Sequence, residues 1–172
     1  PPQEVCWETG NSLPHNSLLS AYWATETTYE YFSSNFNYHG YDGTNTGRTV
    51  VKMVGHPTIS GASNFFNPAS TVGQGVTENL TLTLTAGVAP NTHSTSLDAI
   101  GHEIAHGIDA KYLGLKNLND FSEGNIILEG FCDILGIAVE STKKVNNDWQ
   151  IGNDFYPNEI RYMNNPNNSI FN

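Results

Sequence analysis

The stretch GHEIAHGI, residues 101 to 108, places two histidines four positions apart, with a glutamate directly after the first. Because positions i and i+4 of a helix lie on one face, His102 and His106 can present their imidazoles to a single point. Zinc binds neutral histidine nitrogens at about 2.0–2.1 Å, and two histidines leave two tetrahedral positions open. Glu103 would project beside the metal, where it can accept a proton from zinc-bound water. The stretch therefore predicts a zinc-binding helix; the alternative is a chance match on a surface helix.

A third protein ligand would decide the class of zinc site. A histidine six residues after His106 would mark the metzincin pattern, but that position is Tyr112. The apolar segment GNIILEGFCDILGIAVEST instead offers Glu129 and, four residues later on the same helical face, Asp133. Unpaired carboxylates are costly to bury in so apolar a helix. This favours Glu129 as the third ligand and Asp133 as the acceptor that orients a ligand histidine, over two solvated surface charges.

Composition narrows the range of partners. The 172 residues are enough for a hydrophobic core, and the hydrophobic fraction of 38% is typical of a folded protein. A net charge of -10 argues against nucleic-acid binding, which needs a basic face, and disfavours binding to anionic membranes. Clustered carboxylates could instead hold calcium. No apolar run approaches the roughly 18 residues of a membrane span.

The cysteines and the N-terminal residues are relevant to whether the protein is secreted. Cys6 and Cys132 permit either one intrachain disulfide or two unrelated thiols, and the sequence leaves both open. The polar but weakly charged composition is common among secreted bacterial hydrolases. No signal peptide is present and the sequence starts at Pro1, so we expect a secreted protein in processed form.

Hydrophobic patterning divides the chain into two expected parts. Residues 1–95 should hold an irregular lead-in, a helix from about Leu18 to Phe36 and a β-rich segment. Three- and four-residue spacing predicts an aromatic inner face for that helix, made up of Leu19, Tyr22, Trp23, Glu26, Tyr29, Phe32 and Phe36. The runs TVVKMV and LTLTLT predict short strands. Between them, SGASNFFNPASTVGQG is expected to form a long loop or edge segment.

The second part, residues 96–172, should hold the metal-binding elements. Ser96 can cap a helix from Leu97 to about Tyr112. A second, more apolar helix is expected from about Asn125 to Thr142, followed by a loop-like tail rich in Asn and Pro.

Several motifs in order resemble the thermolysin family of zinc metalloendopeptidases, whose third ligand is a glutamate. The resemblance runs over about residues 21–166, through AYWATETTYEYF, SLDAIGHEIAHGI, SEGNIILEGFCDILGIAVE, NDWQIGNDFY and EIRYM. It implies an α+β fold: a thermolysin-like metalloprotease core in which a β-rich edge segment precedes the metal-binding helices. The C-terminal helical domain of the family is absent from this sequence.

The resemblance implies a role for each matching residue. His102, His106 and Glu129 would bind zinc, Glu103 would be the general base, and Asp133 would orient His102. The family's substrate-binding positions are also matched: Arg161 would donate to the substrate carbonyl next to the scissile bond, and the backbone of Asn64 would bind substrate. An apolar pocket after the scissile bond, which implies a preference for hydrophobic residues there, would be lined by Ala99, Ile151, Phe155 and Ile160.

A calcium site follows from the same resemblance. Asp98, Glu140 and Asp148 match carboxylates that bind calcium in the family. Gln150 and Asn153 stand where members with two calcium ions have glutamates. Because less negative charge cannot easily neutralise two adjacent dications, we expect one calcium ion.

The sequence also departs from the family pattern. The histidine that stabilises the oxyanion belongs to the absent C-terminal domain, the matching tyrosine position falls near Asn117, and Leu128 replaces an asparagine. Loss of an oxyanion donor typically costs about 10²–10³-fold in rate. We therefore expect a zinc endopeptidase present as a fragment or as one chain of a nicked enzyme. One alternative is a catalytically incomplete zinc-binding module of a protease-derived protein. The other is an aminopeptidase, although no acidic motif for a free N-terminus is evident.

Overall fold

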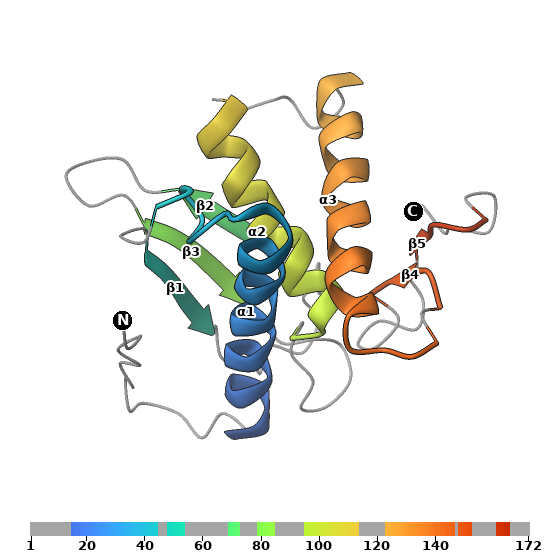
Figure 1. The fold of residues 1–172 in the computed structure, drawn as a ribbon, viewed down its shortest axis with the longest axis horizontal. Helices are drawn as coiled ribbons and strands as arrows, with labels where there is room; N and C mark the ends of the chain where they lie inside the picture. The colour runs from blue at the N-terminus through green and yellow to red at the C-terminus, as the bar shows by residue number, and fades with distance from the viewer. Residues whose placement is uncertain are drawn as a thin grey trace, which may run out of the picture.

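The computed structural model describes residues 15–44, 48–53, 69–72, 79–84, 95–113, 123–146, 148–152 and 161–165. The helices are α1 (His15–Phe36), α2 (Leu97–Leu113) and α3 (Glu123–Ser141). The strands are β1 (Arg48–Met53), β2 (Ala69–Val72), β3 (Asn79–Leu84), β4 (Gln150–Ile151) and β5 (Arg161–Tyr162). α2 is central, because it packs against α1, α3, β2 and β3 (Figure 1). All three predicted helices and both predicted strands are present, with ends that differ by a few residues from those expected. The division of the chain at residue 95 stays a prediction.

The sheet next to α2 has the strand order β1-β3-β2, with β1 parallel and β2 antiparallel to β3. The Leu-Thr alternation of β3 behaves as expected, because Leu80 and Leu82 are fully buried and Thr81 is half-buried. Leu80 packs so closely over Gly107 of α2 that a Cβ at residue 107 would lie 2.5 Å from its Cδ1. β2 comes from the segment expected to be a loop or an edge, and it lies at one edge of this sheet.

The buried face of α1 differs from the prediction. Trp23 and Phe36, assigned to an aromatic inner face, are 48% and 58% exposed. Phe32 is buried and Tyr29 packs against the core, as predicted, but the rest of the buried face consists mainly of small residues: Ala21, Ala24, Thr25 and Thr28. The two threonine hydroxyls donate to the carbonyls of Ala21 and Ala24 at 2.8 Å, so their polar atoms are satisfied inside the helix. Small side chains let α1 pack closely on α2. They recur with the same helical period as the aromatic residues, so the period alone does not show which set is buried.

α2 and α3 approach each other most closely where two glycines meet. A Cβ at Gly101 would lie 3.1 Å from the Cα of Gly136. A Cβ at Gly136 would lie only 2.4 Å from the carbonyl oxygen of Asp98. The two backbones are therefore nearly in contact, which brings side chains on the facing turns of the helices within reach of one another.

The tail, expected to be loop-like, contains a short antiparallel ladder. In it Ile151 of β4 pairs with Arg161 of β5. The amide of Gly152 donates to the Asp98 carboxylate at 2.7 Å, which ties this segment to the start of α2. The ladder and this hydrogen bond together hold Arg161 beside α2 and α3.

The glycine contact can be tested by adding a single methyl group. In Gly136→Ala the new Cβ meets a backbone oxygen that cannot move without shifting α2, so we expect a loss of about 1–3 kcal/mol in the free energy of unfolding. Gly130→Ala in the same helix is the control, because its Cβ meets nothing within 4 Å. Alanine is the better helix former by about 0.8–1.0 kcal/mol, so the control should be neutral or slightly stabilised. Urea unfolding measures both; equal destabilisation of the two variants would contradict the close packing.

Candidate metal centre

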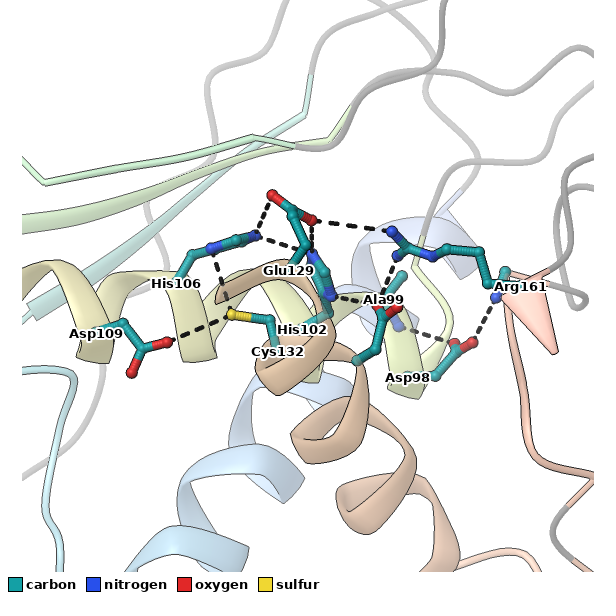
Figure 2. A network of polar contacts seen from close by, with 10 residues as sticks. Asp98, Ala99, His102, His106, Asp109, Glu129, Cys132 and Arg161 are labelled. Atoms are coloured by element: carbon teal, nitrogen blue, oxygen red, sulfur yellow. Dashed lines mark hydrogen bonds and ion pairs between the residues drawn. The ribbon is translucent and has the colours of Figure 1, made fainter. Parts of the chain in front are cut away.

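α2 and α3 bring two histidines and a glutamate together (Figure 2). His102 and His106 lie one turn apart on α2, and their Nε2 atoms are 2.9 Å apart. Glu129 of α3 faces both: its Oε2 lies 3.3 Å from Nε2 of His102, and its Oε1 lies 3.3 Å from Nε2 of His106. One potential ligand atom from each residue lies within 4.8 Å of the others. The three residues thus present two neutral-nitrogen donors and a carboxylate to one point.

This donor set fits a zinc ion. Two ligand atoms in a tetrahedral zinc site with bonds of about 2.0–2.1 Å are about 3.3 Å apart, close to the separations found here. Two histidines and one glutamate also leave a fourth position for water or substrate, as catalytic zinc sites require. The His102 side chain is buried, whereas the Glu129 side chain is 39% exposed, so the centre is accessible from solvent.

The outer nitrogen of His102 is held by a carboxylate. Nδ1 of His102 lies 2.8 Å from Oδ1 of Asp133. Nη2 of Arg161 lies 2.7 Å from the same carboxylate oxygen, and Nη1 of Arg161 lies 3.9 Å from Glu129. A buried aspartate bonded in this way fixes the ring so that Nε2 points at the shared centre. Arg161 compensates the charge of both carboxylates.

The charges of the cluster shift its pKa values. Burial disfavours the protonated form of His102, but hydrogen bonds to Asp133 and Glu129 and the charge of Glu103 outweigh it and raise the pKa of His102 to about 9. Burial of Glu129 acts to raise its pKa, yet the hydrogen bonds from both histidines hold it well below its usual range. Without metal, the protonated form of His102 is therefore favoured beside the Glu129 carboxylate. A metal ion must displace that proton, so its binding is coupled to pH.

Glu103 is buried beside His102 on α2, with 6% of its surface exposed. Its charge contributes to the raised pKa of His102, so the carboxylate lies close to the centre. It is therefore placed where a proton acceptor beside the metal would be needed.

The residues expected to bind calcium are engaged with other groups. Both carboxylate oxygens of Asp98 accept backbone N–H groups, from Ala99 at 2.8 Å and from Gly152 at 2.7 Å. Nζ of Lys144 lies 2.8 Å from Oε1 of Glu140 and 3.7 Å from Oδ2 of Asp148. In the part of the chain that the structure describes, the three carboxylates do not form a compact group able to hold a metal ion. Calcium binding here stays a prediction.

The remaining predicted substrate residues divide into two groups. Ala99 and Ile151 are buried, on α2 and β4. Asn64, Phe155 and Ile160 lie outside the described residues.

Sequence reasoning missed two residues next to the centre: Cys132, which contacts His106, and Asp109, which accepts a hydrogen bond from Cys132. Cys132 is a buried free thiol, and its Sγ lies 3.3 Å from Nδ1 of His106. Cys6, the other cysteine of the possible disulfide, lies outside the described residues. The thiol also donates to Oδ2 of Asp109 at 3.6 Å. Burial and the nearby charge of Asp109 raise the pKa of Cys132 well above its usual range, so the group stays a thiol. Their spacing could have indicated that they lie near the centre, because each residue follows a zinc-ligand candidate by three positions in the same helix.

Comparison with known proteins gives consistent matches. Residues 3–110 match the family described as thermolysin metallopeptidase, catalytic domain. Bacillolysin from Bacillus cereus is 27% identical over 152 residues, covering 85% of this chain and 23% of that protein. Thermolysin from Alicyclobacillus acidocaldarius subsp. acidocaldarius is 29% identical over 143 residues, covering 81% of this chain and 23% of that protein. This chain thus spans about a quarter of the length of these relatives.

A solved structure shows a similar fold. The precursor of protealysin, a metalloproteinase from Serratia proteamaculans, superposes with a TM-score of 0.61 at 22% identity. The match covers 90% of this chain and 45% of that one. None of the three described helices is long and apolar enough to cross a membrane.

Proposed function

The chain belongs to the thermolysin family of metallopeptidases, and on that basis we propose that it provides the zinc centre of an endopeptidase that hydrolyses peptide bonds. The observation that supports this most strongly is the convergence of His102, His106 and Glu129 on one point. Two helix-borne histidines and a glutamate from a second helix are the donors that a catalytic zinc needs, with one position left open.

Zinc bound at this centre would supply the Lewis acid that polarises the scissile carbonyl and activates water. The buried carboxylate of Glu103 takes the proton from the attacking water and passes it to the leaving amine. Asp133 keeps the His102 ring in position, and Arg161 neutralises the carboxylates of Asp133 and Glu129. Each of these roles uses a contact or a placement within the described residues.

Substrate binding is proposed for four residues. The Arg161 side chain is 33% exposed, so a guanidinium N–H that does not face Asp133 can donate to the substrate carbonyl next to the scissile bond. Ala99 and Ile151 supply apolar surface, which suits a hydrophobic residue after the scissile bond. Substrate binding by the backbone of Asn64 rests on the resemblance alone.

A complete active site also needs donors that stabilise the oxyanion of the tetrahedral intermediate. We propose that a further polypeptide, either a C-terminal fragment or a second chain, supplies them. The share of the relatives that this chain spans is compatible with that arrangement. We propose secretion from a processed precursor on the same grounds of family membership. The competing function is a zinc-binding module without catalysis, favoured only by the oxyanion groups missing from the sequence.

Replacement of the proposed base separates these functions. In Glu103→Gln the zinc ligands are untouched, so zinc content should stay at one ion per chain while peptide hydrolysis falls by roughly 10²–10⁴-fold. Glu26→Gln, at an exposed position on α1, is the matched control and should leave both quantities unchanged. The assay uses N-terminally blocked peptides with leucine or aspartate after the scissile bond, in the complete protein that contains this chain.

Three outcomes would count against the proposal. A Glu103→Gln variant that binds zinc and cleaves at the normal rate removes Glu103 as the base. Stoichiometric zinc without any cleavage in the complete protein favours the non-catalytic module. Cleavage only of peptides with a free N-terminus indicates an aminopeptidase.

A further inference from the structure

The two histidines of the metal centre are held at their outer nitrogens by different chemical groups (Figure 2). Nδ1 of His102 lies 2.8 Å from the carboxylate of Asp133. Nδ1 of His106 instead faces the sulfur of Cys132 at 3.3 Å. A thiol is an uncommon neighbour for a ligand histidine, and this one is fully buried between α2 and α3.

The direction of the hydrogen bonds follows from the need to bind a metal. For Nε2 of His106 to offer its lone pair, the proton of the neutral ring must lie on Nδ1, which then acts as a donor. The Cys132 sulfur is the acceptor in range of Nδ1. Its own S–H must therefore point elsewhere, and Oδ2 of Asp109 lies 3.6 Å from Sγ. All three groups can then be satisfied at once, as buried polar groups require.

From this geometry we propose that Cys132 and Asp109 form a relay that positions His106. Asp109 accepts a hydrogen bond from the S–H group of Cys132, and this orients the sulfur lone pairs toward Nδ1 of His106. The hydrogen bond from Nδ1 to the sulfur then fixes the ring with Nε2 toward Glu129. The relay rests on the proposed zinc site, but neither residue touches the metal position itself. Cys132 and Asp109 are thus positioning residues, the counterpart on His106 of Asp133 on His102.

A pair of substitutions at one position isolates the hydrogen bond from packing. Serine can accept from Nδ1 and donate to Asp109, so Cys132→Ser should bind zinc within a few-fold of the unmodified protein. Valine fills the site without polar atoms, so Cys132→Val should weaken zinc binding by about 10–100-fold. Chelator competition gives the dissociation constants. Nitrogen-15 NMR of the metal-free protein reports the tautomer: Nδ1–H of His106 should dominate in the unmodified and Ser proteins and lose that dominance in the Val variant.

Asp109→Asn tests the second link of the relay. Asp109→Asn should weaken zinc binding by several-fold in the otherwise unmodified protein. It should have no further effect in Cys132→Val, because the effects of two substitutions in one chain of hydrogen bonds do not add. This variant and the tautomer measurement decide the case if Cys132→Val does not fold. The relay would be overturned if either Cys132→Val or Asp109→Asn left both the zinc affinity and the His106 tautomer unchanged. Normal zinc affinity without hydrolysis would count against the proposed function only.

A second inference concerns Lys144, and it is independent of zinc. Lys144 follows the last turn of α3, and its ammonium lies between the carboxylates of Glu140 and Asp148. Glu140 is 1% exposed, so its charge needs a compensating cation close by. Calcium would need about six to eight oxygen ligands, whereas the Asp98 oxygens next to this cluster accept backbone N–H groups. Within the described residues, these carboxylates are paired with Lys144 and with backbone N–H groups and do not gather around one metal position.

We infer that the Lys144 ammonium is the counter-ion of this carboxylate cluster, in the place where the family resemblance implies calcium. The end of α3 and the segment that leads to β4 are then joined by an ion pair within the chain. Folding should consequently be independent of calcium.

Thermal unfolding tests this inference with a neighbouring control. Lys144→Met leaves the buried Glu140 charge uncompensated, so Tm should fall by roughly 5–15 °C. Lys143→Met, at the exposed adjacent position, should leave Tm unchanged. Millimolar calcium should not change Tm of the unmodified protein but should raise that of Lys144→Met, in which the carboxylates are no longer paired. A rise in Tm of the unmodified protein with calcium, or equal Tm values for the two lysine variants, would overturn the inference.

Discussion

The near-contact of α2 and α3 at Gly101 and Gly136 is the constraint on which the metal centre depends. His102 follows Gly101 directly, and Glu129 lies seven residues before Gly136, two turns along the same face of α3. With the glycines in contact, that face of α3 is aimed at the histidines of α2. Any side chain larger than hydrogen at residue 136 would meet the backbone of α2 and separate the ligands. A substitution at Gly136 should therefore disturb both the packing of α2 on α3 and the metal site.

The second constraint is electrostatic. The interface of these helices contains buried or half-buried carboxylates on both sides, which would repel one another in a medium of low polarity. The chain balances them with histidines, Arg161 and, at the far end of α3, Lys144. At the centre itself the remaining negative charge of Glu129 and Glu103 favours a dication. This distribution explains why one end of the interface suits zinc while the other is already neutralised by a lysine.

The prediction from sequence succeeded where residues able to bind a metal recur with the period of a helix. The four-residue spacing of the histidines, and of Glu129 with Asp133, placed each pair on one face, and the structure brings these faces together. It failed on part of α1, because alanine and threonine follow the same period as the aromatic residues and propensity does not tell which set is buried. Cys132 and Asp109 were missed because the contact of Cys132 with His106 and its hydrogen bond to Asp109 both join α3 to α2. Spacing within one helix places each residue one turn from a ligand candidate, but it does not show which groups of the other helix the residue meets.

The central claim is that His102, His106 and Glu129 together bind one zinc ion. X-ray absorption at the zinc edge of the metal-loaded protein tests it directly. The account predicts a shell of nitrogen and oxygen neighbours at about 2.0–2.1 Å with histidine outer-shell scattering and no sulfur. A zinc–sulfur distance of about 2.3 Å would contradict it, because Cys132 would then be a ligand rather than the partner of the outer nitrogen of His106.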